Sequence, residues 1–152
     1  MDTTQIITLI LATIGTVLGI INTYNLISNR WVRLKVTPAL GFPDDSTDIR
    51  RVRVCIEVSN LSSFDVTVRE VGFILPDKKK LTITKPETLK GSTWPRRLRA
   101  RESVTVFCNL SELDPKKFRD VKKAYAITDC GVKRMGTSPA LKQLIQIAEK
   151  IS

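Results

Sequence analysis

The first thirty residues constrain this chain more than any other part of it. Residues 3–29 include no charged side chain, and each of the 25 Lys and Arg residues lies at or after Arg30. Within this stretch, residues 5–27 would form a helix about 35 Å long, enough to cross a hydrocarbon core of about 30 Å. The segment therefore predicts a single transmembrane helix.

Two other structures also begin with an apolar segment: a protein with a secretory signal peptide and a soluble protein with a buried helix. A signal peptide needs a basic beginning, a shorter apolar run and a cleavage site of small residues. Here the chain begins Met-Asp-Thr-Thr, and Gly19 is followed by Ile-Ile-Asn-Thr-Tyr, which is a poor cleavage site. We therefore expect a spanning helix, and a buried helix in a soluble domain is the alternative.

Positive charge follows the apolar segment directly, at Arg30, Arg33 and Lys35. Lys and Arg accumulate on the cytoplasmic side of membrane helices, and Trp and Tyr accumulate at the membrane interfaces. The sequence thus predicts a single-pass protein of the inner (plasma) membrane with a short external N-terminus and a cytoplasmic C-terminal domain. The predicted interfacial anchors are Tyr24, Trp31, Arg30 and Arg33.

Small residues gather near one face of the predicted helix. Gly15 and Gly19 have the G-x-x-x-G spacing, which lets two helix backbones approach closely in lipid. This face predicts either self-association or docking onto another membrane protein. The predicted contact residues are Ala12, Gly15, Thr16 and Gly19.

Beyond Arg30, short stretches of alternating apolar and polar residues predict β-strands separated by turns. Residues 50–59 form the clearest strand, and residues 38–48 and 85–95 are expected to be loops. The apolar phase moves from even to odd positions near Arg69 and Glu70, so we expect a β-bulge or a strand break there. Further strands are expected at 31–37, 64–68, 71–75, 81–84, 96–101 and 103–108, with a hairpin over 124–135.

About seven short strands in a domain of this length are typical of an antiparallel two-sheet sandwich. The segments 52–63, 68–73 and 99–107 carry a likeness to known domains: residues 31–136 resemble immunoglobulin-like and fibronectin-III-like β-sandwiches of bacterial membrane-anchored proteins. The resemblance concerns architecture and implies the fold alone, because no functional residue is carried over with it.

The end of the chain predicts an amphipathic helix. Ser138 is a good N-cap, and Pro139 suits the first helical position. The apolar face is expected to pack on the sandwich or to dock a partner helix; it comprises Leu141, Leu144, Ile145, Ala148 and Ile151. The predicted fold class is therefore mainly β. Its parts are an N-terminal tail and transmembrane helix (1–29), a basic β-sandwich (30–136) and a C-terminal helix (137–152).

The residues that usually carry catalysis are scarce. The chain has no histidine, which removes Ser-His-Asp and Cys-His catalysis and imidazole metal sites. The acidic loop of Asp44, Asp45 and Asp48 lacks the EF-hand pattern, and there is no glycine-rich phosphate loop. We expect no enzyme activity, no metal and no cofactor. A Cys55–Cys108 disulfide is conceivable only if the domain is exported, because cytoplasmic thiols stay reduced.

Positive charge is the chemical signal that remains, with a formal net charge of +10. Such a surface attracts an anionic membrane leaflet or an acidic protein. Nucleic acid is a weaker candidate, because aromatic residues suited to base stacking are scarce near the charges, and a merely solvated surface is the simplest alternative. The predicted basic surface comprises Lys78, Lys79, Lys80, Arg96, Arg97 and Arg99.

These features together predict a non-enzymatic, membrane-anchored binding or regulatory module. Its helix would oligomerise or dock onto a membrane partner, and its basic sandwich would contact the leaflet or an acidic partner. This layout is similar to that of small bacterial and prophage accessory proteins, including defence-type factors. The alternative is a structural subunit of an envelope or secretion assembly.

Overall fold

The computed structural model describes residues 2–28, 30–41, 53–88, 91, 93–109, 112–113 and 115–151. The chain divides into two compact units, Met1–Trp31 and Val32–Ser152. The second unit is called the β-rich domain below. The acidic loop of Asp44, Asp45 and Asp48 lies outside the described residues, as do Arg50 and Arg51 at the start of the predicted strand.

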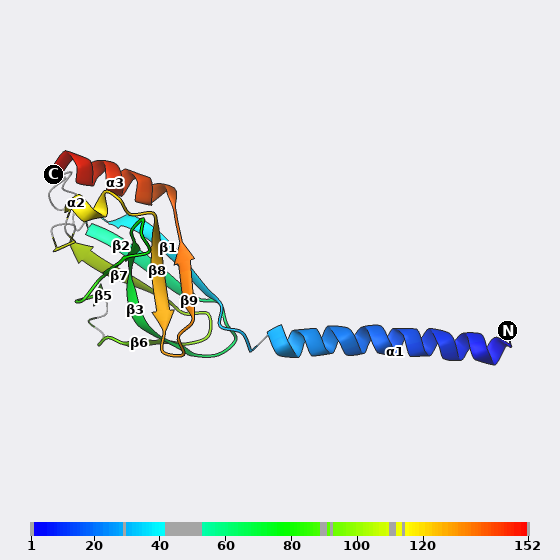
Figure 1. The fold of residues 1–152 in the computed structure, drawn as a ribbon. Helices are drawn as coiled ribbons and strands as arrows, with labels where there is room; N and C mark the ends of the chain where they lie inside the picture. The colour runs from blue at the N-terminus through cyan, green and yellow to red at the C-terminus, as the bar shows by residue number, and fades with distance from the viewer. Residues whose placement is uncertain are drawn as a thin grey trace. The chain divides into compact units, whose positions relative to one another are not determined.

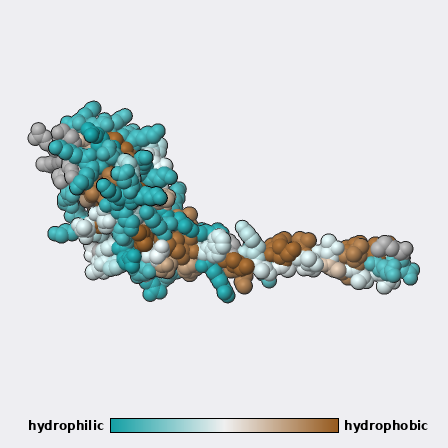
Figure 2. Space-filling view, viewed as in Figure 1, coloured by the Kyte–Doolittle hydropathy of each residue, from teal (hydrophilic) through white to brown (hydrophobic). Residues whose placement is uncertain are grey.

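The first unit is built on one long helix, α1 (Thr3–Ser28). It is long and apolar enough to cross a membrane, and every side chain from residue 3 to residue 27 is exposed. Figure 2 shows brown and white, the colours of apolar and intermediate residues, along most of this helix. The predicted N-terminal apolar helix is thus confirmed, with ends one or two residues beyond those expected.

The β-rich domain contains two antiparallel sheets among its described residues (Figure 1). The four-stranded sheet has the order β1-β2-β7-β5, and the five-stranded sheet has the order β4-β3-β8-β9, with β6 also pairing with β3. The strands are β1 (Leu34–Gly41), β2 (Arg53–Asn60), β3 (Val66–Ile74), β4 (Lys80–Thr82), β5 (Glu87–Thr88), β6 (Arg96–Leu98), β7 (Ser103–Asn109), β8 (Lys123–Thr128) and β9 (Lys133–Gly136). A short helix, α2 (Pro115–Phe118), and a longer one, α3 (Pro139–Ile151), complete the domain.

One apolar core joins both sheets and both helices of the β-rich domain. Ile56 of β2, Phe73 of β3 and Leu144 of α3 are fully buried in it. The rings of Phe73 and Phe118 meet edge to face with centroids 5.0 Å apart, a favoured aromatic geometry. The burial of apolar surface on both sheets gives the domain its main stabilisation.

The predicted irregularity in β3 is confirmed. The register of β3 against β8 shifts between Val68 and Glu70, so one extra residue is accommodated there. This bulge keeps Val68 and Val71 facing the core although they are an odd number of positions apart. The hairpin predicted over 124–135 is also present, as β8 and β9 paired antiparallel.

The first strand differs from the prediction. It begins at Leu34 and runs through Pro38 to Gly41, so the expectation of a loop from residue 38 is wrong for residues 38–41. Pro38 is tolerated because β1 is the edge strand of its sheet and pairs only with β2. The predicted loop over 85–95 likewise includes a two-residue strand, β5.

The C-terminal helix packs on its own domain. Ser138 caps it by accepting a hydrogen bond from the Leu141 N–H (3.3 Å), and its hydroxyl donates to the Pro38 carbonyl. Leu141, Leu144 and Ala148 are buried in the common core, and the helix contacts β1 and α2. The first of the two expected roles of this apolar face is therefore the observed one.

Candidate functional site: an arginine-lined pocket

The small-residue face of α1 is open. A Cβ added at Gly15 or Gly19 would meet nothing within 4 Å. A shallow groove of about 460 Å³ runs along this side of the helix, lined by Thr16, Gly19 and Thr23 together with neighbouring apolar side chains. The Thr16 hydroxyl donates to the Ala12 carbonyl, which leaves the face without a free polar donor at that position. Three of the four predicted contact residues thus border or adjoin this face, together with Gly15.

The predicted interfacial anchors lie at and after the end of α1. Tyr24 and Trp31 are 70% and 65% exposed, the values expected of side chains whose surroundings are supplied from outside the chain. Arg30 is exposed as well. Arg33 belongs to the β-rich domain, where its N–H donates to the Ser62 hydroxyl (2.8 Å).

The structure separates the two halves of the predicted basic surface. Lys78 and Lys79 lie in the exposed turn before β4, and Lys80 begins β4 itself. β4 pairs with the end of β3 at Gly72–Ile74, whereas β6, which begins with Arg96, pairs with the start of β3 at Val66–Val68. The three lysines and the three arginines therefore lie at opposite ends of β3 and form two surfaces.

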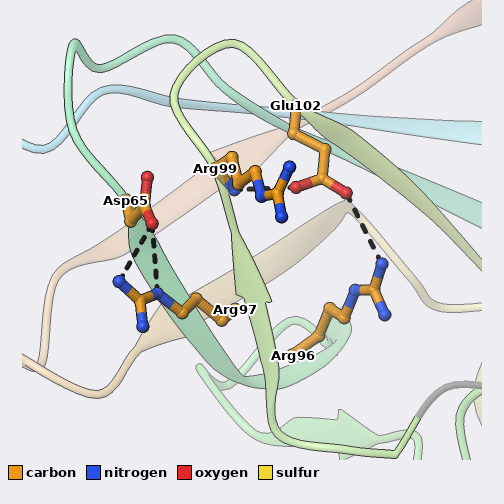
Figure 3. A pocket seen from close by; sticks show the side chains of 5 residues that line it. All are labelled: Asp65, Arg96, Arg97, Arg99 and Glu102. Atoms are coloured by element: carbon orange, nitrogen blue, oxygen red, sulfur yellow. Dashed lines mark hydrogen bonds and ion pairs between the residues drawn. The ribbon is translucent and has the colours of Figure 1, made fainter.

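The three arginines converge on a pocket of about 480 Å³ that also includes two carboxylates (Figure 3). Arg96 and Arg97 stand on β6, and Arg99 lies in the tight loop that joins β6 to β7. Asp65 comes from the segment before β3, and Glu102 from the residue before β7. Local sequence brings together the arginines and Glu102, but only the pairing of β6 with β3 brings Asp65 to them.

Each carboxylate holds one arginine and one backbone amide. Asp65 accepts hydrogen bonds from the Arg97 side chain (3.0 and 3.1 Å) and from the Ala100 N–H (3.2 Å). Glu102 accepts the Arg99 N–H (2.8 Å) and lies 3.5 Å from the Arg96 guanidinium. The backbone bond from Arg99, helped by the charge of Arg96, lowers the pKa of Glu102 below its ordinary value, although burial acts in the opposite direction.

A buried asparagine fixes the loop that carries Arg99. The Asn60 amide donates to the carbonyls of Phe64 (2.8 Å), Leu98 (3.3 Å) and Arg99 (3.0 Å), and Asn60 is fully buried. Its backbone N–H also donates to the Glu102 carbonyl (2.9 Å). The sequence indicated only a turn at this residue, because its long-range partners are set by the fold.

Two arginine groups at the pocket are left without protein partners. The Nε of Arg96 is buried and has no hydrogen-bond partner, the one such side-chain atom in the part of the chain that the structure describes. The Arg99 guanidinium forms no hydrogen bond or ion pair with a described residue, while its backbone is firmly held. An unpartnered buried donor is costly, so this arrangement favours an acceptor from outside the chain.

A second polar cluster lies on the outer face of the five-stranded sheet. Tyr125 of β8 is fully buried, and its hydroxyl donates to the Glu70 carboxylate and lies 2.8 Å from the Thr82 hydroxyl. The ammonium groups of Lys80 and Lys133 lie 5.6 and 5.2 Å from the centre of its ring. This sequence gave no sign of the cluster, whose members come from four strands.

These contacts hold the tyrosine neutral and the glutamate ionised. Burial and the bond to Glu70 raise the pKa of Tyr125 well above its usual range. The Tyr125 hydroxyl is the main cause that lowers the pKa of Glu70, with smaller contributions from Thr82 and Lys80. The cluster is closed on itself and covers the sheet, so it reads as structural.

The cysteines are separate and free. Cys108 points into the core, whereas Cys55 points out of the opposite face of the same sheet, where the β2–β7 register pairs it with Phe107. A disulfide between them is excluded by this geometry. Burial raises the pKa of Cys55 to about 11 and, with the nearby Glu112 carboxylate, that of Cys108 to about 12, so both thiols are protonated at neutral pH.

Metal-binding chemistry has no cluster to act on in the described ranges, where no three Cys, Asp or Glu side chains come together in a way that could hold an ion. No protein-family model matches the chain. No curated protein matches its sequence either. The pocket geometry and the two-unit organisation are therefore what bear on its function.

Proposed function

We propose that this protein is a non-enzymatic binding module anchored in the inner membrane by a single span, with a basic cytoplasmic domain that contacts the anionic leaflet. The observation that carries the proposal is the complete exposure of α1, an uncharged helix of 26 residues. A helix that is apolar on all sides is stable only when lipid or protein surrounds it. Its own domain does not bury it, so the bilayer is the surrounding we propose.

Charge supports the orientation. Arg30, Arg33 and Lys35 follow the helix within a few residues, and no Lys or Arg precedes it. The positive-inside bias then assigns the β-rich domain to the cytoplasm. Basic residues near an anionic leaflet gain about 1 kcal/mol each, so the anchored domain would be attracted to the lipid surface.

The fold supports a binding role rather than catalysis. We infer that the two antiparallel sheets form a β-sandwich of the immunoglobulin-like or fibronectin-III-like class, because both contribute their inner faces to one core. Such folds serve many functions and do not define one. The absence of histidine from the sequence and the protonated state of Cys55 and Cys108 weigh against nucleophilic catalysis.

The alternative of an exported structural subunit depended on a disulfide between Cys55 and Cys108. Their placement on opposite faces of one sheet removes that support. We therefore retain the cytoplasmic module as the proposal.

The test is membrane extraction of the full chain, combined with topology reporters. We expect the protein to resist alkaline carbonate and high salt, to retain Met1 or Asp2 by intact mass, and to place a C-terminal reporter in the cytoplasm. A chain cleaved near Gly19 and released from the membrane would show a signal peptide and contradict the proposal. A C-terminal reporter active only outside would contradict the orientation.

A further inference from the structure

We propose that the arginine-lined pocket binds the phosphate group of an anionic phospholipid. The inference rests on the proposed function, because it gives the leaflet contact a defined site. The pocket residues are Arg96, Arg97 and Arg99, with Asp65 and Glu102 as the carboxylates that position them.

The first argument is chemical. A guanidinium presents a planar fork of N–H donors that matches a phosphate, and hydrogen bonds between ionised groups are stronger than neutral ones. Three guanidinium groups line the pocket against two carboxylates, so one positive charge is left unbalanced. The excess charge belongs to Arg99, whose guanidinium is not engaged by a described residue. The buried Nε of Arg96 adds a donor that lacks an acceptor.

The second argument is that the site is already built. Asp65 holds Arg97 and the Ala100 N–H, and Glu102 holds the Arg99 N–H near the Arg96 guanidinium. A binding site that is held in place before the ligand arrives loses less conformational entropy on binding. A surface of solvated arginines would have no such scaffold. The pocket volume of about 480 Å³ also lies in the range of small-molecule sites.

The third argument is the position of the pocket within the β-rich domain. The Arg33 N–H donates to the Ser62 hydroxyl, and the Arg33 carbonyl accepts the Leu61 N–H (2.7 Å). The adjacent Asn60 in turn bonds the Arg99 carbonyl. The pocket is therefore at the end of the domain where the chain enters it from α1.

This position brings a lipid ligand within reach. Arg33 follows Ser28, the last residue of α1, by five positions, which span at most about 18 Å even when fully extended. If α1 is anchored as proposed, the chain entry is the part of the domain that cannot leave the headgroup region. Tethering raises the effective concentration of lipid phosphates at the pocket, so a weak intrinsic affinity would suffice.

The experiment uses the full-length protein in a neutral detergent, with the arginine Nε–H signals followed by NMR. The probes are a short-chain phosphatidic acid, inorganic phosphate and an acidic peptide without phosphate. We expect the Arg96 and Arg99 signals to shift on addition of the short-chain lipid. Arg99→Gln should weaken this binding about tenfold, because it removes the free guanidinium and keeps the backbone bonds of residue 99.

The matched control is Arg119→Gln, which removes the same charge from an exposed residue that follows α2. Figure 1 shows α2 near α3, toward the other end of the strands from β6. We expect this control to change the affinity less than twofold. Equal weakening by both variants would show diffuse electrostatic attraction and overturn the pocket.

The remaining outcomes separate the ligand sources. Inorganic phosphate that binds as tightly as the short-chain lipid would assign the site to free phosphate, and stronger binding of the acidic peptide would assign it to a protein; either result overturns the lipid proposal. Carbonate extraction of Arg99→Gln should match that of the wild type. A wild type that binds the lipid probe but is released by carbonate would overturn the membrane anchor and leave the pocket standing.

Discussion

Tyr125 shows how one residue can be buried away from the core. It lies opposite Gly72 on β3, on the sheet face that does not contribute to the main apolar cluster. The lack of a side chain at Gly72 leaves room there, and a Cβ at that position would overlap the Leu81 carbonyl of the neighbouring strand. The ring is then enclosed by Lys80 and Lys133, whose aliphatic stems cover it while their ammonium groups face its π-surface.

Tyr125→Phe removes the hydroxyl that bonds Glu70, and we expect the free energy of unfolding at pH 7 to fall by about 1–2 kcal/mol. The wild-type bond lowers the pKa of Glu70 below the ordinary 4.5, so its stabilisation is present above that pH and is lost as the pH falls through the folded value. The difference between variant and wild type should therefore shrink at about pH 3. Denaturant unfolding of the full chain in detergent at both pH values checks this, and a pH-independent difference would contradict it.

Gly136 at the end of β9 marks a close approach between the two sheets. A Cβ there would overlap the carbonyl oxygen of Val36 on β1, although β1 and β9 are not hydrogen-bonded neighbours. We expect Gly136→Ala to destabilise the domain by about 3 kcal/mol, because backbone on both strands must move. Thr137→Ala, at the exposed next residue, is the control, and thermal unfolding measures both. Equal stability of the two variants would contradict the close approach.

At the scale of elements, edges decide where strands end. β1 continues through Pro38 because its outer edge needs no further ladder bonds, and the Pro38 carbonyl is used by the Ser138 hydroxyl at the start of α3. The C-terminal helix thus covers the edge strand instead of leaving it open to another chain. The bulge at Val68/Glu70 works in the same direction, since it keeps β3 facing the core along its whole length.

Leu144→Ala tests the docking of α3. Leu144 is fully buried in the common core, and its truncation should cost about 2–4 kcal/mol. Gln143→Ala, at the exposed neighbouring position, should cost less than about 0.5 kcal/mol. Hydrogen exchange of α3 in the full chain should rise in the first variant alone. Unchanged protection in Leu144→Ala would show that the helix is held by other contacts.

At the scale of the whole molecule, two units of opposite character share one short connection. α1 is apolar and exposed, while Figure 2 shows polar residues over most of the visible face of the β-rich domain. Such a division is expected of a protein that works at a membrane surface. The small-residue face of α1 is then available to a second helix.

Gly15→Leu combined with Gly19→Leu should reduce chemically crosslinked species of the full chain in native membranes several-fold, because two leucines hold neighbouring helix backbones apart. Ile7→Leu combined with Ile14→Leu keeps the helix apolar and leaves the small-residue face intact, so this control should crosslink as the wild type does. Crosslinking that is equal in both double variants would show that the face is not an association surface.

Local pattern was enough to predict several elements of this protein. The apolar helix followed from the run of residues without charge, the bulge from the phase change near Arg69, and the start of α3 from Ser138 and Pro139. Each of these depends on interactions within a few residues, and such interactions are written directly in the order of side chains. The composition likewise showed that positive charge would dominate the surface.

Tertiary structure alone decided which distant residues meet. Asp65 and Arg97 are brought together by the β3–β6 pairing, Cys55 and Cys108 are kept apart by the two faces of one sheet, and the predicted lysine and arginine surfaces are separated along β3. Strand order and sheet face depend on how the whole core closes, because each strand can satisfy its backbone hydrogen bonds with several partners. The apolar pattern limits those choices, and the packing of the common core selects among them.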